Sequence, residues 1–171
     1  IKLSFTQSIR TRTQLAGAMG KKLLLDSAEV LQRLEDKTYL AQYGLIPETA
    51  VCLFIPNTYE VYWTMSADQL FARMHKEYLR FWNEERRAKA KALDLTPVEV
   101  ATLASIVASE TNKTAEHPLI ASLYLNRLNK GIALQACPTV IYAVGDFKMR
   151  RVLKRHLRID SPYNTYTHQG L

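Results

Sequence analysis

The segment 96–110 reads as an apolar helix that ends in a carboxylate, and such a helix belongs in the interior of a fold. It opens with Thr96-Pro97-Val98-Glu99, which supplies an N-cap residue, a proline at the first helical position and a glutamate at the third. No charge occurs from Val100 to Ser109. We therefore expect other elements to pack on all sides of this helix, and Glu110 to emerge from the core at its C-terminal end.

Glu110 shares a helical face with Leu103, Ile106 and Val107. Apolar surroundings and the negative end of the helix dipole both favour the protonated carboxylic acid, which is the form that a general acid needs. The alternative is a helix-end glutamate that reaches solvent or pairs with Lys113. On the local pattern alone, this alternative is favoured.

A second carboxylate is not indicated by the spacing. Glu99 lies on the same face but about 16 Å away along the helix axis, whereas paired glycosidase carboxylates lie about 5–9.5 Å apart. Glu116, Asp146 and Asp160 could approach Glu110 in space, and the spacing favours none of them. If the chain cleaves glycans, a single catalytic acid is the simpler interpretation.

The remaining elements are predicted from periodicity and from capping or turn residues. Strands are expected at 2–5 and 51–55, and 60–63 is either a further strand or an aromatic loop. Helices are expected at about 13–25, 27–43, 66–93 and 115–130. Within 66–93 an aromatic stripe is interpreted as core; its members are Phe71, Met74, Tyr78, Phe81 and Trp82. Helices with a few short strands predict an α+β fold.

Composition and charge limit the kinds of partner that the chain could bind. The 171 residues carry a net charge of +7, but the lysines and arginines are scattered, and the densest cluster, 84–91, mixes both signs. A solvated helix face is favoured over a nucleic-acid surface, and no apolar run approaches the length of a membrane span. The two cysteines, Cys52 and Cys137, stand in apolar settings and are expected to be buried free thiols.

Other chemistries are not supported by motifs. The four histidines lack metal-ligand spacing, Ser105 lacks a nucleophile elbow, and 17–20 is a lone GxxG. We therefore expect no metal and no organic cofactor.

Several ordered motifs then carry a specific resemblance. They are Phe54-Ile55-Pro56-Asn57-Thr58-Tyr59-Glu60-Val61-Tyr62, Phe81-Trp82, Leu103-Ala104-Ser105-Ile106-Val107, Glu110-Thr111, Leu125-Asn126-Arg127-Leu128, Leu134-Gln135, Pro138-Thr139-Val140-Ile141-Tyr142 and Tyr163-Asn164-Thr165-Tyr166. In this order and spacing they closely resemble the YceG-like endolytic murein transglycosylases, especially Bacteroidetes-like members. An older label of some members, aminodeoxychorismate lyase, implies a pyridoxal-phosphate enzyme, for which the chain offers neither a Schiff-base lysine setting nor a phosphate loop.

The resemblance implies a single-pass protein of the inner membrane whose catalytic part faces the periplasm. Its substrate would be nascent peptidoglycan glycan strands, and peptidoglycan synthases would be its partners. The resemblance also implies that 1–50 is an N-terminal α/β segment following a LysM-like module, and that 51–171 is a helix-rich catalytic domain. The chain is expected to begin after the first LysM-like portion and to stop inside the catalytic domain, so the membrane anchor would lie outside it.

The resemblance assigns the catalytic role to Glu110. Many members have Glu-x-Glu-Thr here, and Ala108 replaces the first glutamate, which leaves Glu110 as the carrier on this helix. Cys137 stands where the family usually has aspartate. Substrate-binding roles are expected for Asn126, Gln135, Thr139, Tyr163, Asn164 and Tyr166.

The expected reaction is non-hydrolytic cleavage of the MurNAc–GlcNAc β-1,4 bond to give 1,6-anhydroMurNAc ends. Because the C6 hydroxyl of the same MurNAc serves as the nucleophile, no second carboxylate is required. The alternative function is a non-catalytic module that binds peptidoglycan or a synthase. A salt-bridged Glu110 with no cleft beside it would favour that alternative.

Overall fold

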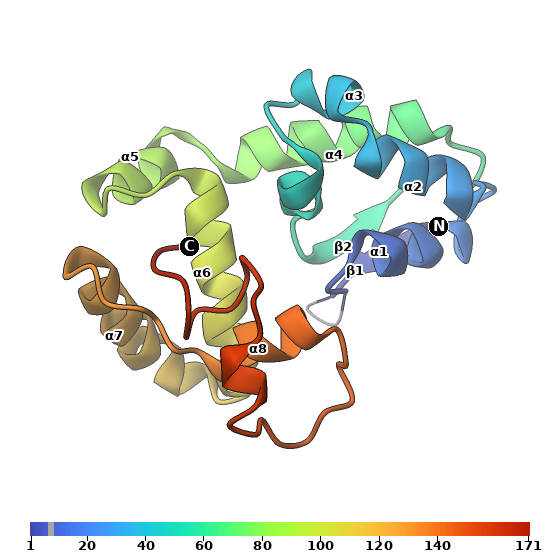
Figure 1. Ribbon diagram of the computed structural model, residues 1–171. Helices are drawn as coiled ribbons and strands as arrows, with labels where there is room; N and C mark the ends of the chain where they lie inside the picture. Colours follow the sequence, from blue (N-terminus) through green and yellow to red (C-terminus); the bar gives the residue numbers. More distant parts are fainter. Residues whose placement is uncertain (7–8) are drawn as a thin grey trace. The chain divides into compact units, whose positions relative to one another are not determined.

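The computed structural model describes residues 1–6 and 9–171, and the chain forms two compact units, Ile1–Val98 and Glu99–Leu171. In Figure 1 the first unit runs from blue to green and the second from yellow-green to red. Helices with one small sheet make up the described part of the chain, as the α+β prediction expects. The predicted division into a segment 1–50 and a catalytic domain 51–171 follows from the family resemblance and not from compactness, and it stays a prediction.

The first unit contains the small sheet. Strand β1 (Lys2–Phe5) pairs antiparallel with β2 (Asn57–Glu60) (Figure 1). In this register Leu3 stands opposite Tyr59. Leu3, Phe5 and Tyr59 point inward, as the period-two pattern of a half-buried strand requires. The strand at 2–5 is confirmed. For 60–63 the loop alternative holds beyond Glu60, because the second strand covers Asn57–Glu60 and ends there.

The helices of the first unit are shorter than predicted. They are α1 (Arg12–Gly20), α2 (Ser27–Glu35), α3 (Lys37–Ala41), α4 (Ala67–Phe81) and α5 (Glu84–Ala92). The helix predicted over 27–43 breaks at Asp36, whose carboxylate accepts a hydrogen bond from Tyr39 N at 3.0 Å and so caps α3. The helix predicted over 66–93 breaks before Asn83, which caps α5 through Arg86 N at 3.0 Å. The capping box of Ser66 and Gln69 is confirmed.

The strand predicted at 51–55 is wrong. Residues Pro47–Leu53 form a 3-10 helix, η1, whose start is held by Thr49, since its hydroxyl accepts from Ile46 N at 3.2 Å. A three-residue period places Ala50 and Leu53 on one side, and both are fully buried. An apolar run of five residues fits either element, and Pro47 favours the helical turn because it has no N–H to satisfy.

The core of the first unit gathers around Phe71 of α4. Its ring packs edge-on against Phe54 at 5.3 Å and against Tyr39 at 5.4 Å between centroids. Met74, Tyr78 and Trp82 of the predicted aromatic stripe are also buried, while Phe81 is 36% exposed. The interpretation of this stripe as core therefore holds for four of its five members.

The second unit is built on two consecutive helices. Helix α6 (Pro97–Glu110) is followed by the 3-10 turn η2 (Thr114–Glu116) and by α7 (His117–Asn129). Helix α8 (Cys137–Val144) and the turn η3 (His156–Arg158) come next, and the last segment, red in Figure 1, folds back on the start of α8. The predicted helices at 96–110 and 115–130 are confirmed, and Gly131 ends the latter with a φ of +63°.

Among the described residues, no single helix has the length and apolar character to cross a membrane. Helices α5 and α6 meet that criterion only when taken together, across the break between Ala92 and Pro97.

Candidate active site

Glu110 is the last residue of α6, and it is exposed. The face behind it is buried through Leu103, Ile106 and Val107, as predicted. The expectation that α6 is interior on all sides is wrong, because Ala104 and Ser105 are exposed. Small side chains on that side give little apolar area to cover, so the helix buries one stripe. The carboxyl of Glu110 thus stands at the edge of an apolar core and reaches solvent.

The ion pairs near this helix end leave Glu110 out. Lys113 pairs with Glu116, with Nζ and Oε1 3.2 Å apart, and Glu116 also accepts a hydrogen bond from the Thr111 hydroxyl at 2.8 Å. Within residues 1–6 and 9–171, no ion pair includes Glu110. The salt bridge that would favour a purely binding role is not formed there, and the carboxylate of Glu116 is committed elsewhere.

Tyr124 of α7 is a buried tyrosine in the electrostatic surroundings of Glu110. Its side chain is 4% exposed. Burial raises the pKa of Tyr124 to about 12, and the charge of Glu110 acts in the same direction. Near neutral pH the phenol therefore keeps its proton.

Arg127 lies one helical turn after Tyr124, on the same side of α7. Its guanidinium donates to Leu134 O at 2.7 Å and to Ala133 O at 3.3 Å, which fixes the segment leading to Gln135. Its positive charge opposes the rise in the pKa of Tyr124 and of Tyr166. One face of α7 thus carries both Tyr124, on which the charge of Glu110 acts, and Arg127, which binds the backbone before α8.

Tyr166 enters the same surroundings from the C-terminal segment. Its hydroxyl oxygen lies 3.5 Å from Cys137 Sγ. The hydrogen bond with Cys137 raises the pKa of Tyr166 to about 12, together with burial and the charges of Cys137 and Glu110. Cys137 is exposed, so the prediction that it is buried is wrong, although both cysteines are free as expected. The first residue of α8 thus reaches solvent.

Gln135 and Thr139 are brought to the same loop. Gln135 has a φ of +55°, an unusual conformation for a residue with a side chain, and its N donates to Thr165 O at 3.0 Å. Thr139 is buried, donates to Ala136 O at 2.7 Å and has its hydroxyl 2.8 Å from that of Thr165. The side chain of Gln135 is exposed, so of these two residues it is the one able to meet a ligand.

Asn164 is fully buried and holds the C-terminal loop. Its amide donates to Ile159 O at 2.8 Å and to Leu157 O at 3.2 Å, and its Oδ1 accepts from Tyr166 N at 3.0 Å. Tyr163 is 43% exposed and packs edge-on against Tyr142 at 4.9 Å between centroids. The loop therefore presents Tyr163 outward and anchors itself through Asn164.

Asn126 is exposed on α7, two residues after Tyr124. Residues two apart on a helix point in different directions. The side chain of Asn126 therefore does not share the surroundings of Tyr124. The substrate-binding roles of all six predicted residues stay predictions.

Tyr124 and Arg127 are absent from the sequence-based list of site residues. The available signal was their spacing: a tyrosine and an arginine three residues apart share one helical face. That spacing gives no indication that the face meets the end of α6.

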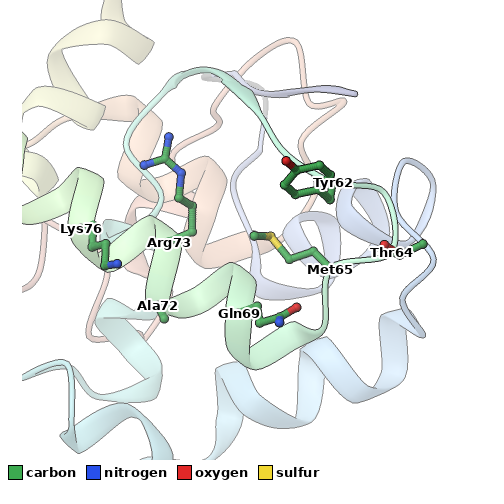
Figure 2. A pocket seen from close by; sticks show the side chains of 7 residues that line it. All are labelled: Tyr62, Thr64, Met65, Gln69, Ala72, Arg73 and Lys76. Carbon is green, nitrogen blue, oxygen red and sulfur yellow. The ribbon is translucent and has the colours of Figure 1, made fainter.

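Figure 2 shows a concavity of about 480 Å³ in the first unit, lined from the loop after β2 and from α4. Its lining residues are Tyr62, Thr64, Met65, Gln69, Ala72, Arg73 and Lys76. None of the residues predicted for the site lines it. In the described part of the chain, no group of three or more His, Cys, Asp or Glu is arranged to hold a metal ion.

Comparisons with known proteins agree with the motifs. The chain is 31% identical over 174 aligned residues to the endolytic murein transglycosylase of Bacillus subtilis (strain 168), covering 93% of this chain and 48% of that protein. It is 29% identical to the endolytic murein transglycosylase of Streptococcus pneumoniae serotype 2, covering 98% of this chain and 29% of that protein. The chain thus spans about half the length, or less, of the curated relatives it matches.

A crystal structure supports the same relationship. A yceG-like protein from Listeria monocytogenes, solved at 2.6 Å, superimposes with a TM-score of 0.80 at 27% identity. The match covers 99% of this chain and 60% of that one. The model of the YceG-like family matches residues 5–171. With nearly its whole length matched, the chain belongs to the YceG-like family.

Proposed function

We propose that this chain is part of an endolytic lytic transglycosylase that cleaves the MurNAc–GlcNAc β-1,4 bond of peptidoglycan, with Glu110 as its single catalytic acid. The observation that carries the proposal is the exposed Glu110 at the C-terminal end of α6, which takes part in no ion pair within the described residues and whose charge acts on the buried Tyr124. Two curated relatives of the chain are named endolytic murein transglycosylases.

In the first step, Glu110 donates its proton to the glycosidic oxygen as the bond from that oxygen to C1 of MurNAc breaks. The leaving GlcNAc departs with a free 4-hydroxyl, and C1 develops oxocarbenium character. In the second step, the Glu110 carboxylate removes the proton of the C6 hydroxyl while O6 bonds to C1. The product is a 1,6-anhydroMurNAc end, and Glu110 is protonated again, so protons and bonds balance without water.

The substrate's own C6 hydroxyl is the nucleophile, so one protein carboxylate is enough. The residues around Glu110 support this arrangement: Glu116 is engaged by Lys113 and Thr111, and Glu110 is the carboxylate whose charge acts on both Tyr124 and Tyr166. Of the residues expected to bind the glycan, Gln135 and Tyr163 have exposed side chains suited to hydroxyl groups and to a sugar face. Thr139 and Asn164 would act by shaping the loop that carries them.

The same proposal extends to the whole protein. A membrane anchor outside these residues would hold it in the inner membrane as a single-pass protein, with this part facing the periplasm. There it would act on nascent strands beside the peptidoglycan synthases, in cell wall biogenesis.

The experiment compares the full-length protein with its Glu110→Gln variant on uncrosslinked glycan strands, with mass analysis of the products. We expect 1,6-anhydroMurNAc ends from the native protein and a loss of at least about 100-fold in rate for E110Q, with an unchanged melting temperature. Products with reducing MurNAc ends would contradict the transglycosylase assignment. A fully active E110Q would contradict the role of Glu110. Retained glycan binding by a native protein that releases no product would favour the non-catalytic alternative.

A further inference from the structure

Residues 148–158 form a basic loop that holds six of the chain's 23 lysines and arginines and no acidic residue. The six are Lys148, Arg150, Arg151, Lys154, Arg155 and Arg158. Since all 171 residues together have a net charge of +7, the basic loop carries most of the positive excess. The expectation that the cations are scattered, with their densest cluster at 84–91, is therefore wrong for this part of the chain.

All six side chains are exposed, and most of the basic loop lies in the irregular stretch between α8 and η3 (Figure 1). In the part of the chain that the structure describes, none of the six forms an ion pair with an aspartate or a glutamate. Like charges held close together repel one another, so the arrangement costs stability unless an anion offsets it. An exposed run of this kind is typical of a surface that binds an anionic partner.

Both ends of the basic loop are held at Tyr163 and Asn164. Before its first residue, Phe147 packs against Tyr142 with 6.1 Å between ring centroids, and Tyr142 packs against Tyr163 at 4.9 Å. After its last residue, Ile159 O accepts a hydrogen bond from the buried Asn164 amide at 2.8 Å. Because Tyr163 and Asn164 are neighbours in the chain, the basic loop is attached at both ends to the loop that presents Tyr163 to solvent.

We infer that the basic loop is an anion-binding extension of the glycan site, and that it binds the carboxylates of the peptides carried by an uncrosslinked glycan strand. This inference rests on the proposed function, in which the exposed Tyr163 ring faces a sugar. A peptide that is not crosslinked ends in a free carboxylate, so such a strand carries negative charge beside its sugars. A strand lying on Tyr163 would therefore bring these carboxylates to the cations of the basic loop.

The residue types in the basic loop suit carboxylates. Four of its six cations are arginines. The planar guanidinium of arginine pairs with a carboxylate through two parallel hydrogen bonds, which a lysine cannot form. Anionic lipid headgroups would also attract exposed cations. The attachment of the basic loop to Tyr163 and Asn164 favours the substrate over a membrane surface.

The test neutralises four exposed cations of the basic loop in one fourfold variant, R150Q/R151Q/K154Q/R158Q. The matched control removes the same charge from four exposed lysines of the first unit, as K21Q/K22Q/K37Q/K91Q. A third variant, R150K/R151K/R158K, keeps the charge. All are made in the full-length protein with Glu110→Gln, so that strands stay intact during binding. If the fourfold variant does not fold, as its melting temperature shows, R150Q/R151Q replaces it.

The probes are end-labelled uncrosslinked glycan strands that carry their peptides, and the same strands with their carboxylates converted to amides. Fluorescence anisotropy in the first seconds after mixing measures their binding. We expect the fourfold variant to bind the carboxylate-bearing strands about tenfold more weakly than its E110Q parent, since four exposed charge pairs of modest strength are lost. On amidated strands the two should differ less than about twofold. The control and the lysine variant should bind like the parent.

Two further measurements follow from the same physics. Salt screens exposed pairs, so the difference between parent and fourfold variant should narrow as the ionic strength rises. In the protein that retains Glu110, the four substitutions should raise KM about tenfold and change kcat less than about twofold, because they affect binding of the peptides and not the reacting bond.

The outcomes are distinct. Unchanged binding of carboxylate-bearing strands by the fourfold variant overturns the inference and leaves the proposed function in place. Equal weakening on both kinds of strand also overturns it, because the basic loop would then hold the sugars or its own fold. So does unchanged strand binding with lost binding to vesicles of phosphatidylcholine and phosphatidylglycerol, which would assign the cations to a membrane surface.

The proposed function fails separately. An inactive native protein or a fully active E110Q overturns it. The anisotropy in the first seconds after mixing then still decides whether the basic loop binds the carboxylates.

Discussion

The hydroxyls of Thr139 and Thr165 lie 2.8 Å apart inside the second unit and join the first turn of α8 to the loop that carries Tyr163 and Tyr166. The Thr139 oxygen also accepts from Thr165 N at 3.3 Å, and the Thr165 oxygen accepts from Ala136 N at 3.0 Å. Two hydroxyls thus satisfy two backbone donors that would otherwise be buried without partners.

Thr139→Val is therefore expected to destabilise the chain by about 1–3 kcal/mol, since it keeps the shape but leaves Thr165 N and Thr165 Oγ1 short of a partner. Thr139→Ser, which retains the hydroxyl, should cost less. Urea unfolding followed by circular dichroism measures both. Equal stabilities for the two variants would show that the hydroxyl contributes nothing.

The ion pair of Arg33 and Asp68 predicts a pH dependence. Arg33 Nε lies 2.7 Å from Asp68 Oδ1, and the Tyr39 hydroxyl donates to the same oxygen at 2.9 Å. The hydrogen bond from Arg33 and then that from Tyr39 lower the pKa of Asp68 below its ordinary value. A depressed folded-state pKa gives stability that is present above the unfolded value, about 4, and is lost as pH falls through the folded one.

We expect Asp68→Asn to lower the stability of the native chain near pH 7 by less than about 1 kcal/mol, because the side chain of Asp68 is 61% exposed and water screens the pair. The difference between native and D68N should shrink as the pH falls below about 4. Urea midpoints at pH 7, 5 and 3 measure it. A difference that grows toward acid pH would contradict the sign.

The two thiols are expected to react at different rates. Cys137 is exposed at the start of α8, whereas burial raises the pKa of the half-buried Cys52 thiol. A maleimide at pH 8 should therefore label Cys137 at least about tenfold faster than Cys52. Peptide mapping after timed labelling gives both rates.

Labelling of Cys137 is also expected to block the proposed activity, because its sulfur lies 3.5 Å from the Tyr166 hydroxyl. Cys137→Ser should make the activity resistant to the reagent. If C137S loses activity on labelling as fast as the native protein, the block does not come from this thiol.

At Gln135 the effect of the left-handed backbone conformation can be tested separately from the effect of the side-chain amide. Glycine adopts a φ of +55° without strain, so Gln135→Gly should be more stable than Gln135→Ala by about 1 kcal/mol. If the amide binds the glycan as proposed, both variants should lose activity to the same extent. Thermal unfolding and product release measure the two effects. Full activity in either variant would show that the Gln135 amide takes no part in glycan binding.

Much of the fold could be predicted because its signals are local. The capping box at Ser66, the proline that opens α6 and the glycine that ends α7 each act within one helical turn. The breaks at Asp36 and Asn83 escaped prediction because both residues also occur on the exposed faces of continuous helices. Their capping role depends on where the chain must turn. The run at 51–55 was misassigned because a short apolar stretch suits a strand and a helical turn equally well.

The candidate site, too, could be predicted only in part. Glu110 could be found from the sequence because its helix is apolar and its motif is ordered with others along the chain. The effect of its charge on Tyr124 could not, since it depends on how α6 and α7 are arranged, and no residue pattern within either helix gives that arrangement. Asn164 is expected at the substrate because it sits in a motif, and this role stays a prediction; that its amide donates to two carbonyl oxygens of its own loop could not be read from the motif.

The pairing of β1 with β2 has a consequence for dissecting the protein. The first strand of the chain depends for its backbone partners on residues 57–60, which lie beyond every helix of the segment 1–50. A shortened version that stops after residue 50 would leave β1 as an unpaired edge with Leu3 and Phe5 uncovered, a feature that promotes aggregation. Expression trials of the N-terminal part should therefore keep at least residues 1–60 together.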